Sequence, residues 1–283
     1  IIELKEILQT STSLLKELCN WALDNKIKHK ELLFKINVTR GRPCELHRNH
    51  VLSNLVKDIS QLRVVEAVKE MINDSIYKPE FLKPESIYFP SPVVGSDSFD
   101  DKKFLLAIRR LSYHLGLKVP APGLVKEWND IRAGWRSLGI TVGNDQTFES
   151  LVKETENLKS LVNLQRRLSV AADKKALEFL KYLYTLGQYY RSKTRQSPEF
   201  LLGRAIYCDQ NGDFKRPREL FIDGNIPDYL KKISDDLFEP LCKKLLHEEF
   251  SKDEGLKQHF QALGMTIMNE SKAIEELYSK IHR

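Results

Sequence analysis

The sequence lacks any long apolar run and several of the motifs that mark common enzyme sites. No stretch approaches the ~18 uninterrupted apolar residues that a membrane-spanning helix needs. It contains no GxxxxGK[ST] loop and no GxGxxG fingerprint for nucleotide phosphates, and no GxSxG elbow for a serine nucleophile. The seven histidines stand in no recognisable frame with a nucleophile. We therefore expect no catalytic residues, no cofactor and no membrane partner.

Cysteine is also scarce, and no leader for secretion is recognisable. The four cysteines, Cys19, Cys44, Cys208 and Cys242, lie far apart, which indicates reduced thiols in a cytoplasmic protein and not a disulfide framework. The first residues, IIELKEILQ, carry charge from the third position, unlike the apolar part of a signal peptide. Because the 283-residue chain does not begin with Met, we expect it to be a piece of a longer protein.

One stretch has the residue types of a zinc site without the complete ligand set. Cys44, His47 and His50 are spaced C-x2-H-x2-H, but a structural zinc site needs four ligands and no fourth stands nearby. We therefore interpret the stretch as a histidine-bearing loop before a helix and predict no metal there.

A second stretch, DQNGD, begins like a calcium-binding loop. Counted from Asp209 as position 1, however, Gly212 falls at position 4 and Glu219 at position 11, whereas an EF-hand needs Gly at 6 and Glu at 12. The Asn211-Gly212 dipeptide suits a type I′ turn between two short strands. The sequence therefore predicts a β-hairpin that binds no calcium.

Apolar residues at helical spacing predict most of the remaining structure. The expected helices span residues 3–30, 50–59, 61–72, 100–116, 120–139, 226–241, 255–263 and 269–281, and residues 147–191 form either one long helix or a helical hairpin broken near 169–173. Four prolines between residues 78 and 95 exclude helix there. The predicted fold is α+β and mainly α-helical, with small β-hairpins and one long helix or helical hairpin.

Changes in this pattern divide the chain into four expected regions. They are 1–78, helical with a short strand-turn insertion; 79–143, proline-led and helical; 144–196, the basic long helix or helical hairpin; and 197–283, a hairpin plus C-terminal helices.

Two short patterns recur along the chain. One is RPCEL (42–46), KPESI (83–87) and RPREL (216–220); the other is LGLKV (115–119), LGITV (138–142) and LGMTI (263–267). Each Leu-Gly pair ends an expected helix at a glycine that tolerates positive φ. The recurrence indicates either chance or a repeated unit of hairpin, proline-led extended piece, one or two helices and a Leu-Gly stop.

Positive charge is concentrated in one part of the chain. Residues 153–196 hold ten bases and four acids, so this segment carries the whole net charge of +6. Tyrosines alternate with cations between residues 179 and 195, which suits single-stranded nucleic acid or RNA; the other interpretation is an exposed basic helix face with leucine and tyrosine packed inward. The candidate contact residues are Arg166, Arg167, Lys174, Lys175, Arg191, Lys193 and Arg195.

The segment from Ile206 to Phe250 carries a family resemblance. Its CDQNGDFKRPRELFIDGNIPDYLKKI, followed by LCKKLLHEEF, resembles a pattern of large sacsin-like proteins with a histidine-kinase-like (Hsp90-type, GHKL) ATPase domain. In that family a PNQNG-F-K hairpin precedes an IPEELK-I helix, and Asp209 stands where the family usually has Pro or Asn. The ATPase motifs, an Asn-bearing helix and DxGxG, do not occur here. The resemblance therefore implies the non-catalytic region of such a protein.

These observations favour a non-catalytic scaffold or coupling region of a larger ATP-driven cytoplasmic protein, chaperone-like or defence-related. Its partners would be other domains of the parent protein or an acidic protein. The alternative is a nucleic-acid-binding module that uses the basic 153–195 face.

Overall fold

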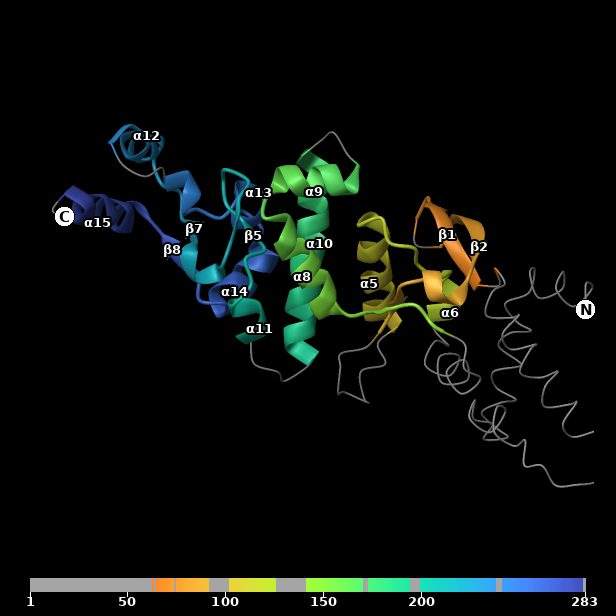
Figure 1. Ribbon diagram of the computed structural model, residues 1–283. Coiled ribbons are helices and arrows are strands. Elements are labelled where there is room, and N and C mark those ends of the chain that lie inside the picture. Colours follow the sequence, from red (N-terminus) through yellow and green to blue (C-terminus); the bar gives the residue numbers. More distant parts are fainter. Residues whose placement is uncertain are drawn as a thin grey trace, which may run out of the picture. The chain divides into compact units, whose positions relative to one another are not determined.

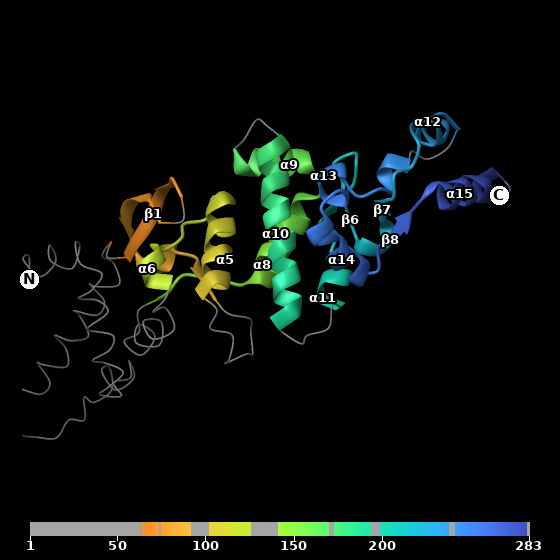
Figure 2. The same cartoon turned by 180° about the vertical axis from the view of Figure 1, so that it is seen from behind.

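The computed structural model describes residues 63, 65–73, 75–91, 102–125, 141–169, 173–193, 199–237 and 241–281 (Figures 1 and 2). Within these ranges the chain is mainly α-helical and its strands form only two-stranded sheets, which confirms the predicted α+β class. The predicted helices 3–30 and 50–59, the RPCEL segment and the loop with Cys44, His47 and His50 lie outside the described residues.

The chain folds as two compact units that divide between Phe148 and Glu149. The expected region boundary between residues 143 and 144 lies close to this division. The boundary expected between residues 78 and 79 lies within a strand, β2 (Tyr77–Leu82). The boundary between residues 196 and 197 lies outside the described part of the chain.

Residues 65–158 form a series of small sheets and helices that we call the first module. In chain order its described elements are β1 (Val65–Met71), β2, the 3-10 helix η1 (Pro84–Ser86), β3 (Phe89–Pro90), α5 (Lys102–His114), α6 (Pro122–Val125), β4 (Asp145–Gln146) and α8 (Phe148–Leu158). Strands β1 and β2 pair antiparallel, and β3 pairs parallel with β4. Helix α8 begins after the single residue Thr147.

Residues 207–281, the second module, repeat this order. The elements are β5 (Tyr207–Cys208), β6 (Phe214–Lys215), η2 (Pro217–Glu219), β7 (Phe221–Asp223), α12 (Asp228–Leu237), η3 (Leu241–Lys243), α13 (Glu248–Ser251), α14 (Glu254–Ala262), β8 (Thr266–Met268) and α15 (Glu270–Ile281). Strands β5 and β6 pair antiparallel, and β7 pairs parallel with β8. Helix α15 begins after the single residue Asn269, whose side chain accepts the N–H of Lys272 and so caps the helix.

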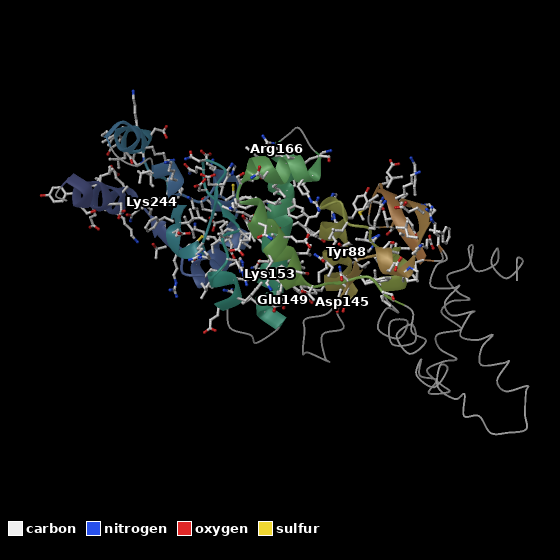
Figure 3. All side chains as sticks on the ribbon, in the orientation of Figure 1. Tyr88, Asp145, Glu149, Lys153, Arg166 and Lys244 are labelled. Carbon is white, nitrogen blue, oxygen red and sulfur yellow. The ribbon has the colours of Figure 1, made fainter. Side chains whose placement is uncertain are left out.

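Three backbone hydrogen bonds of the first module recur at equivalent positions of the second. In the first module the N–H groups of Val68, Ala121 and Tyr88 donate to the carbonyls of Val119, Glu66 and Lys118, respectively. In the second module the N–H groups of Gln210, His247 and Phe221 donate to the carbonyls of Leu245, Cys208 and Lys244, respectively. All six N···O distances are 2.7–3.0 Å. The first two bonds of each module join the first hairpin to a later segment. The third joins that later segment to the residues after the 3-10 helix; Figure 3 labels Tyr88, the donor of this bond in the first module, and Lys244, its acceptor in the second.

The recurring basic-Pro motif has one conformation in both modules. Pro84 and Pro217 each begin a 3-10 helix, behind an extended residue, and the Ser86 and Glu219 N–H groups each donate across the turn at 3.0 Å. Proline suits this position because it has no N–H to leave unpaired and a fixed φ. The structure therefore supports a true internal repeat, in which the proline-led piece begins as a 3-10 helix.

Two of the Leu-Gly stops are also present. Helix α5 is followed by Gly116 with φ of 78°, and α14 by Gly264 with φ of 89°. Most of the third stop, residues 138–142, lies outside the described ranges.

The helix predicted over residues 61–72 is wrong, because strand β1 lies in this segment. Ala67 and Val68 point to opposite faces of the strand, and both are fully buried. Ala67 also pairs with Pro120 on the edge away from β2. The sequence of β1 therefore lacks the alternation of apolar and polar residues that marks a half-buried strand. A register shift between Val68 and Glu70 interrupts the alternation further.

The hairpin predicted at Asn211-Gly212 is confirmed, but the predicted type I′ turn is wrong. Gly212 has φ of 89°, whereas Asn211 does not have the positive φ that this turn requires. Instead, Asp209 Oδ1 accepts the backbone N–H groups of Asn211 at 2.9 Å and Asp213 at 2.8 Å. The carboxylate thereby closes the loop from inside, as Asp side chains commonly do in turns.

Candidate interaction surface

A helical hairpin within residues 161–193 carries most of the candidate basic residues. It consists of α9 (Leu161–Leu168) and α10 (Asp173–Lys193), so of the two expected alternatives the structure has the hairpin broken near residues 169–173 and not one long helix. Ser169 ends α9 in the left-handed conformation, with φ of 54°. The sequence analysis missed a second break, between α8 and α9, where Lys159 has φ of 65° and the Ser160 side chain caps α9.

Four of the candidate cations lie at the end of the hairpin where α9 leads into α10. Arg166 and Arg167 stand in the last turn of α9, and Lys174 and Lys175 stand in the first turn of α10 (Figure 3 labels Arg166). All four side chains are exposed. We call these four residues the basic cluster.

The exposure of the basic cluster follows from the apolar pattern of the hairpin. Leu164 of α9 and Ala176, Leu180 and Leu183 of α10 are at most 1% exposed. These residues recur at helical spacing and take the inward faces of both helices, which leaves the intervening cations to solvent.

The two lysines of the basic cluster occupy an electrostatically unfavourable place. Cations near a helix C-terminus are stabilised by the helix dipole, as for Arg166 and Arg167, whereas cations in a first turn are disfavoured by about 0.3–1 kcal/mol each. Lys174 and Lys175 stand in such a first turn. Folding therefore gains nothing from their charge at this place.

The other predicted cations do not join the basic cluster. Arg191 lies 16 residues beyond Lys175 on the same helix, a rise of about 24 Å at 1.5 Å per residue, and it is half-buried. Lys193 is the last residue of α10, and Arg195 lies outside the described residues. The predicted continuous basic face on one long helix is thus divided, with the basic cluster at one end.

Two of the four tyrosines of α10 serve as internal contacts. Tyr184 is 1% exposed, and its hydroxyl donates to the Ile206 carbonyl at 2.8 Å and accepts the Cys208 N–H at 3.1 Å. Tyr190 is 4% exposed and donates to Glu149 at 2.8 Å. Burial raises the pKa of both phenols above the ordinary value. Neither ring is available to stack on a nucleic-acid base.

A second surface is a groove of about 750 Å³ in the second unit. It is lined by Lys181, Gln210, His247, Glu248, Glu249, Lys252, Asp253 and Glu254. Two ion pairs lie along it, Lys181 to Asp253 at 2.7 Å and Lys252 to Glu248 at 2.9 Å. The hydrogen bond from each lysine lowers the pKa of its carboxyl partner. Asp253 also caps α14, so its position is explained by the fold.

No group of three His, Cys, Asp or Glu side chains in the described ranges is placed to hold a metal ion. Among the helices that the structure describes, none combines the length and apolarity needed to cross a membrane. No family model, no curated protein and no solved structure matches the chain.

Proposed function

We propose that this chain is a non-catalytic scaffold that holds protein partners, as a coupling region of a larger ATP-driven, sacsin-like cytoplasmic protein. The observation that carries the proposal is the duplicated module, with its matched hydrogen bonds and 3-10 helices. Repeated modules are typical of proteins that present extended surfaces for binding other proteins.

The basic cluster is the contact that the proposal assigns to an acidic protein partner. Its lysines stand where the helix dipole disfavours them, so a role in binding accounts for them better than a role in folding. Four exposed cations on two adjacent helix turns match a patch of carboxylates, and their attraction weakens with salt.

Nucleic acid is the second candidate partner, because the same four exposed cations could contact phosphates. The burial of Tyr184 and Tyr190 removes two of the aromatic rings that would stack on bases. This burial favours the protein partner.

The test compares two probes on matched variants. Lys174→Glu with Lys175→Glu reverses two charges of the basic cluster and improves the interaction with the helix dipole. Lys232→Glu with Lys243→Glu changes the net charge equally at two exposed lysines of the second module. Both variants and the unmodified chain are titrated at physiological salt with a polyglutamate peptide and with a mixed-sequence oligonucleotide.

The proposal predicts that polyglutamate binds the unmodified chain and the control, and binds the 174/175 variant at least about tenfold more weakly. Submicromolar binding of the oligonucleotide, steeply weakened by salt and lost in the same variant, would establish the nucleic-acid alternative. If neither probe binds, the basic cluster has no such contact role.

A further inference from the structure

Apolar side chains are exposed along one face of α15 and beside it on α12. Ile274 and Tyr278 of α15 are 47% and 62% exposed, and Tyr229 and Ile233 of α12 are 54% and 42% exposed. Each pair is spaced i, i+4 and so lies on one face of its helix. The two helices contact each other, and the Tyr229 hydroxyl donates to Glu270 at 2.6 Å.

The exposed face of α15 is separate from the face that builds the core of the second module. Ala273 and Leu277 pack into an apolar cluster that includes Ile226, Leu230 and Met268. Ile274 directly follows Ala273 in the helix, and Tyr278 directly follows Leu277. Ile274 and Tyr278 therefore add nothing to that cluster and form a second apolar stripe on an otherwise amphipathic helix.

The first module shows what such a face contacts. Helices α8 and α15 each begin one residue after the second parallel strand of their module, so the two helices can be aligned from their first residues. In this alignment Leu151 corresponds to Ala273, and Thr155 corresponds to Leu277. Leu151 and Thr155 are both buried. By the same count, Val152 corresponds to Ile274 and Glu156 corresponds to Tyr278.

In the first module this second face of α8 is covered. Val152 is 0% exposed. Glu149, one turn earlier on the same face, accepts the Tyr190 hydroxyl (Figure 3 labels Glu149). Glu156 accepts the Arg204 guanidinium at 3.0 Å and the Ala205 N–H at 2.9 Å.

The covering residues come from one contiguous stretch of chain. Tyr190 belongs to the last part of α10, and Arg204 and Ala205 follow the short helix α11 (Glu199–Leu202). The end of one helix, α10, and the residues after α11 thus contact this face of α8.

We propose that the face of α15 around Ile274 and Tyr278 docks an amphipathic helix, as the end of α10 contacts the equivalent face of α8. The face of α15 has isoleucine and tyrosine where that of α8 has valine and glutamate, so it is built for contact.

The chemistry of the partner follows from the same comparison. Ser271 and Tyr278 stand at the positions of Glu149 and Glu156, so α15 offers no carboxylate at these two positions. The docking helix therefore meets Ile274 and Tyr278 with an apolar stripe of leucine and aromatic residues, like the Leu180, Leu183 and Leu186 stripe of α10.

This inference rests on the proposed scaffold role, to which it adds a second surface. Its test uses no residue of the basic cluster, so the two proposals can fail independently. If the polyglutamate experiment fails while α15 binds a helical probe, only the acidic contact is lost.

The probe is a synthetic peptide of residues 160–205 of this chain, which contains α10 and the residues Tyr190, Arg204 and Ala205 that contact α8. It is titrated into the full chain, and protection of α15 amides is followed by hydrogen–deuterium exchange with mass spectrometry. Ile274→Asp with Tyr278→Lys removes the stripe without changing the net charge. Ile72→Asp with Ile76→Lys is the matched control on two exposed isoleucines of the first module.

We expect the peptide to protect α15 at micromolar concentration, and to bind the 274/278 variant at least about tenfold more weakly than the control. The absence of protection at millimolar peptide would overturn the proposal. Sedimentation velocity of the chain alone is run alongside. A dimer that the 274/278 variant loses would show that a second copy occupies the face, which also overturns the assignment of this face to an amphipathic helix of another partner.

Discussion

The two modules share their backbone hydrogen bonds and differ in how the first hairpin is supported. In the first module β1 and β2 pair at six positions between Val65 and Leu82, whereas β5 and β6 of the second module pair at two. Two such short strands do not form a stable hairpin by themselves. The second hairpin therefore depends on packing from outside its own strands.

Tyr184 supplies that packing. Its ring contacts Tyr207, Phe250 and Phe260 with centroid distances of 4.9–5.7 Å, and its hydroxyl bonds to the backbone at Ile206 and Cys208. In the first module a single bond from the Met71 N–H to the Tyr113 hydroxyl, at 3.0 Å, is the analogous contact. One backbone frame is thus completed by strand pairing in the first module and by aromatic packing in the second.

The largest expected effect comes from the glycines beside the parallel strands. A Cβ at Gly143 would overlap the backbone carbonyl oxygen of Ile87, whereas a Cβ at Gly224 would overlap its neighbours less severely, with a methyl group of Ile267 at 2.7 Å and the backbone oxygen of Met268 at 2.9 Å. We expect Gly143→Ala to cost at least about 3 kcal/mol of unfolding free energy and Gly224→Ala about 1–2 kcal/mol. Urea denaturation measures both. Equal costs would contradict this difference between the modules.

A buried histidine makes the second module sensitive to acid. His259 is 1% exposed, and burial, followed by the nearby Arg191 charge, lowers its pKa to about 4. Below the unfolded value of about 6.5, only the unfolded chain binds this proton, so stability falls as the pH drops from about 6.5 to 4, by up to ~3 kcal/mol. We expect this loss in urea midpoints at pH 7, 6, 5 and 4.5.

The control for the histidine prediction is His259→Leu, which removes the titrating group and should flatten this part of the pH profile. A profile unchanged by His259→Leu would show that other groups cause the acid sensitivity.

Removal of one tyrosine hydroxyl from each module tests the difference in hairpin support with a smaller expected loss of stability. Tyr184→Phe leaves two buried backbone groups unpaired and should cost about 2–3 kcal/mol, whereas Tyr113→Phe frees one group that water can reach and should cost about 1 kcal/mol or less. Thermal unfolding of both variants gives the comparison. A larger loss for Tyr113→Phe would reverse our account of the two hairpins.

The smallest expected difference between the modules is at the glycines of the two Leu-Gly stops. Alanine at Gly116 or Gly264 would meet no atom within 4 Å, but both backbones have positive φ. Each substitution should therefore cost about 1–2 kcal/mol, from backbone strain alone. Clearly unequal denaturation midpoints for the two variants would show that the Leu-Gly stops are not equivalent.

Sequence patterns identified the elements whose signals are local. Helices α5, α10, α12, α14 and α15 were predicted because their apolar residues repeat at helical spacing. Strand β1 was missed because its burial comes from partners far along the chain, at Pro79 and Pro120. The break before α9 was missed because Lys159 adopts a positive φ that its residue type does not indicate.

The candidate surfaces were predictable in part. The sequence identified the cations of the basic cluster, but only the hairpin turn brings Arg166 and Arg167 near Lys174 and Lys175. The stripe on α15 was missed because Ile274 is inconspicuous in a helical pattern. The alignment of α15 with α8, which needs the strand pairings, reveals it.

The central claim is that the two modules repeat one backbone frame, and amide hydrogen exchange by NMR tests it most directly. The account predicts matched protection within each equivalent pair of donors, Val68 with Gln210, Ala121 with His247, and Tyr88 with Phe221. If one member of a pair is protected while its counterpart exchanges as fast as an unstructured peptide, the duplicated frame is contradicted.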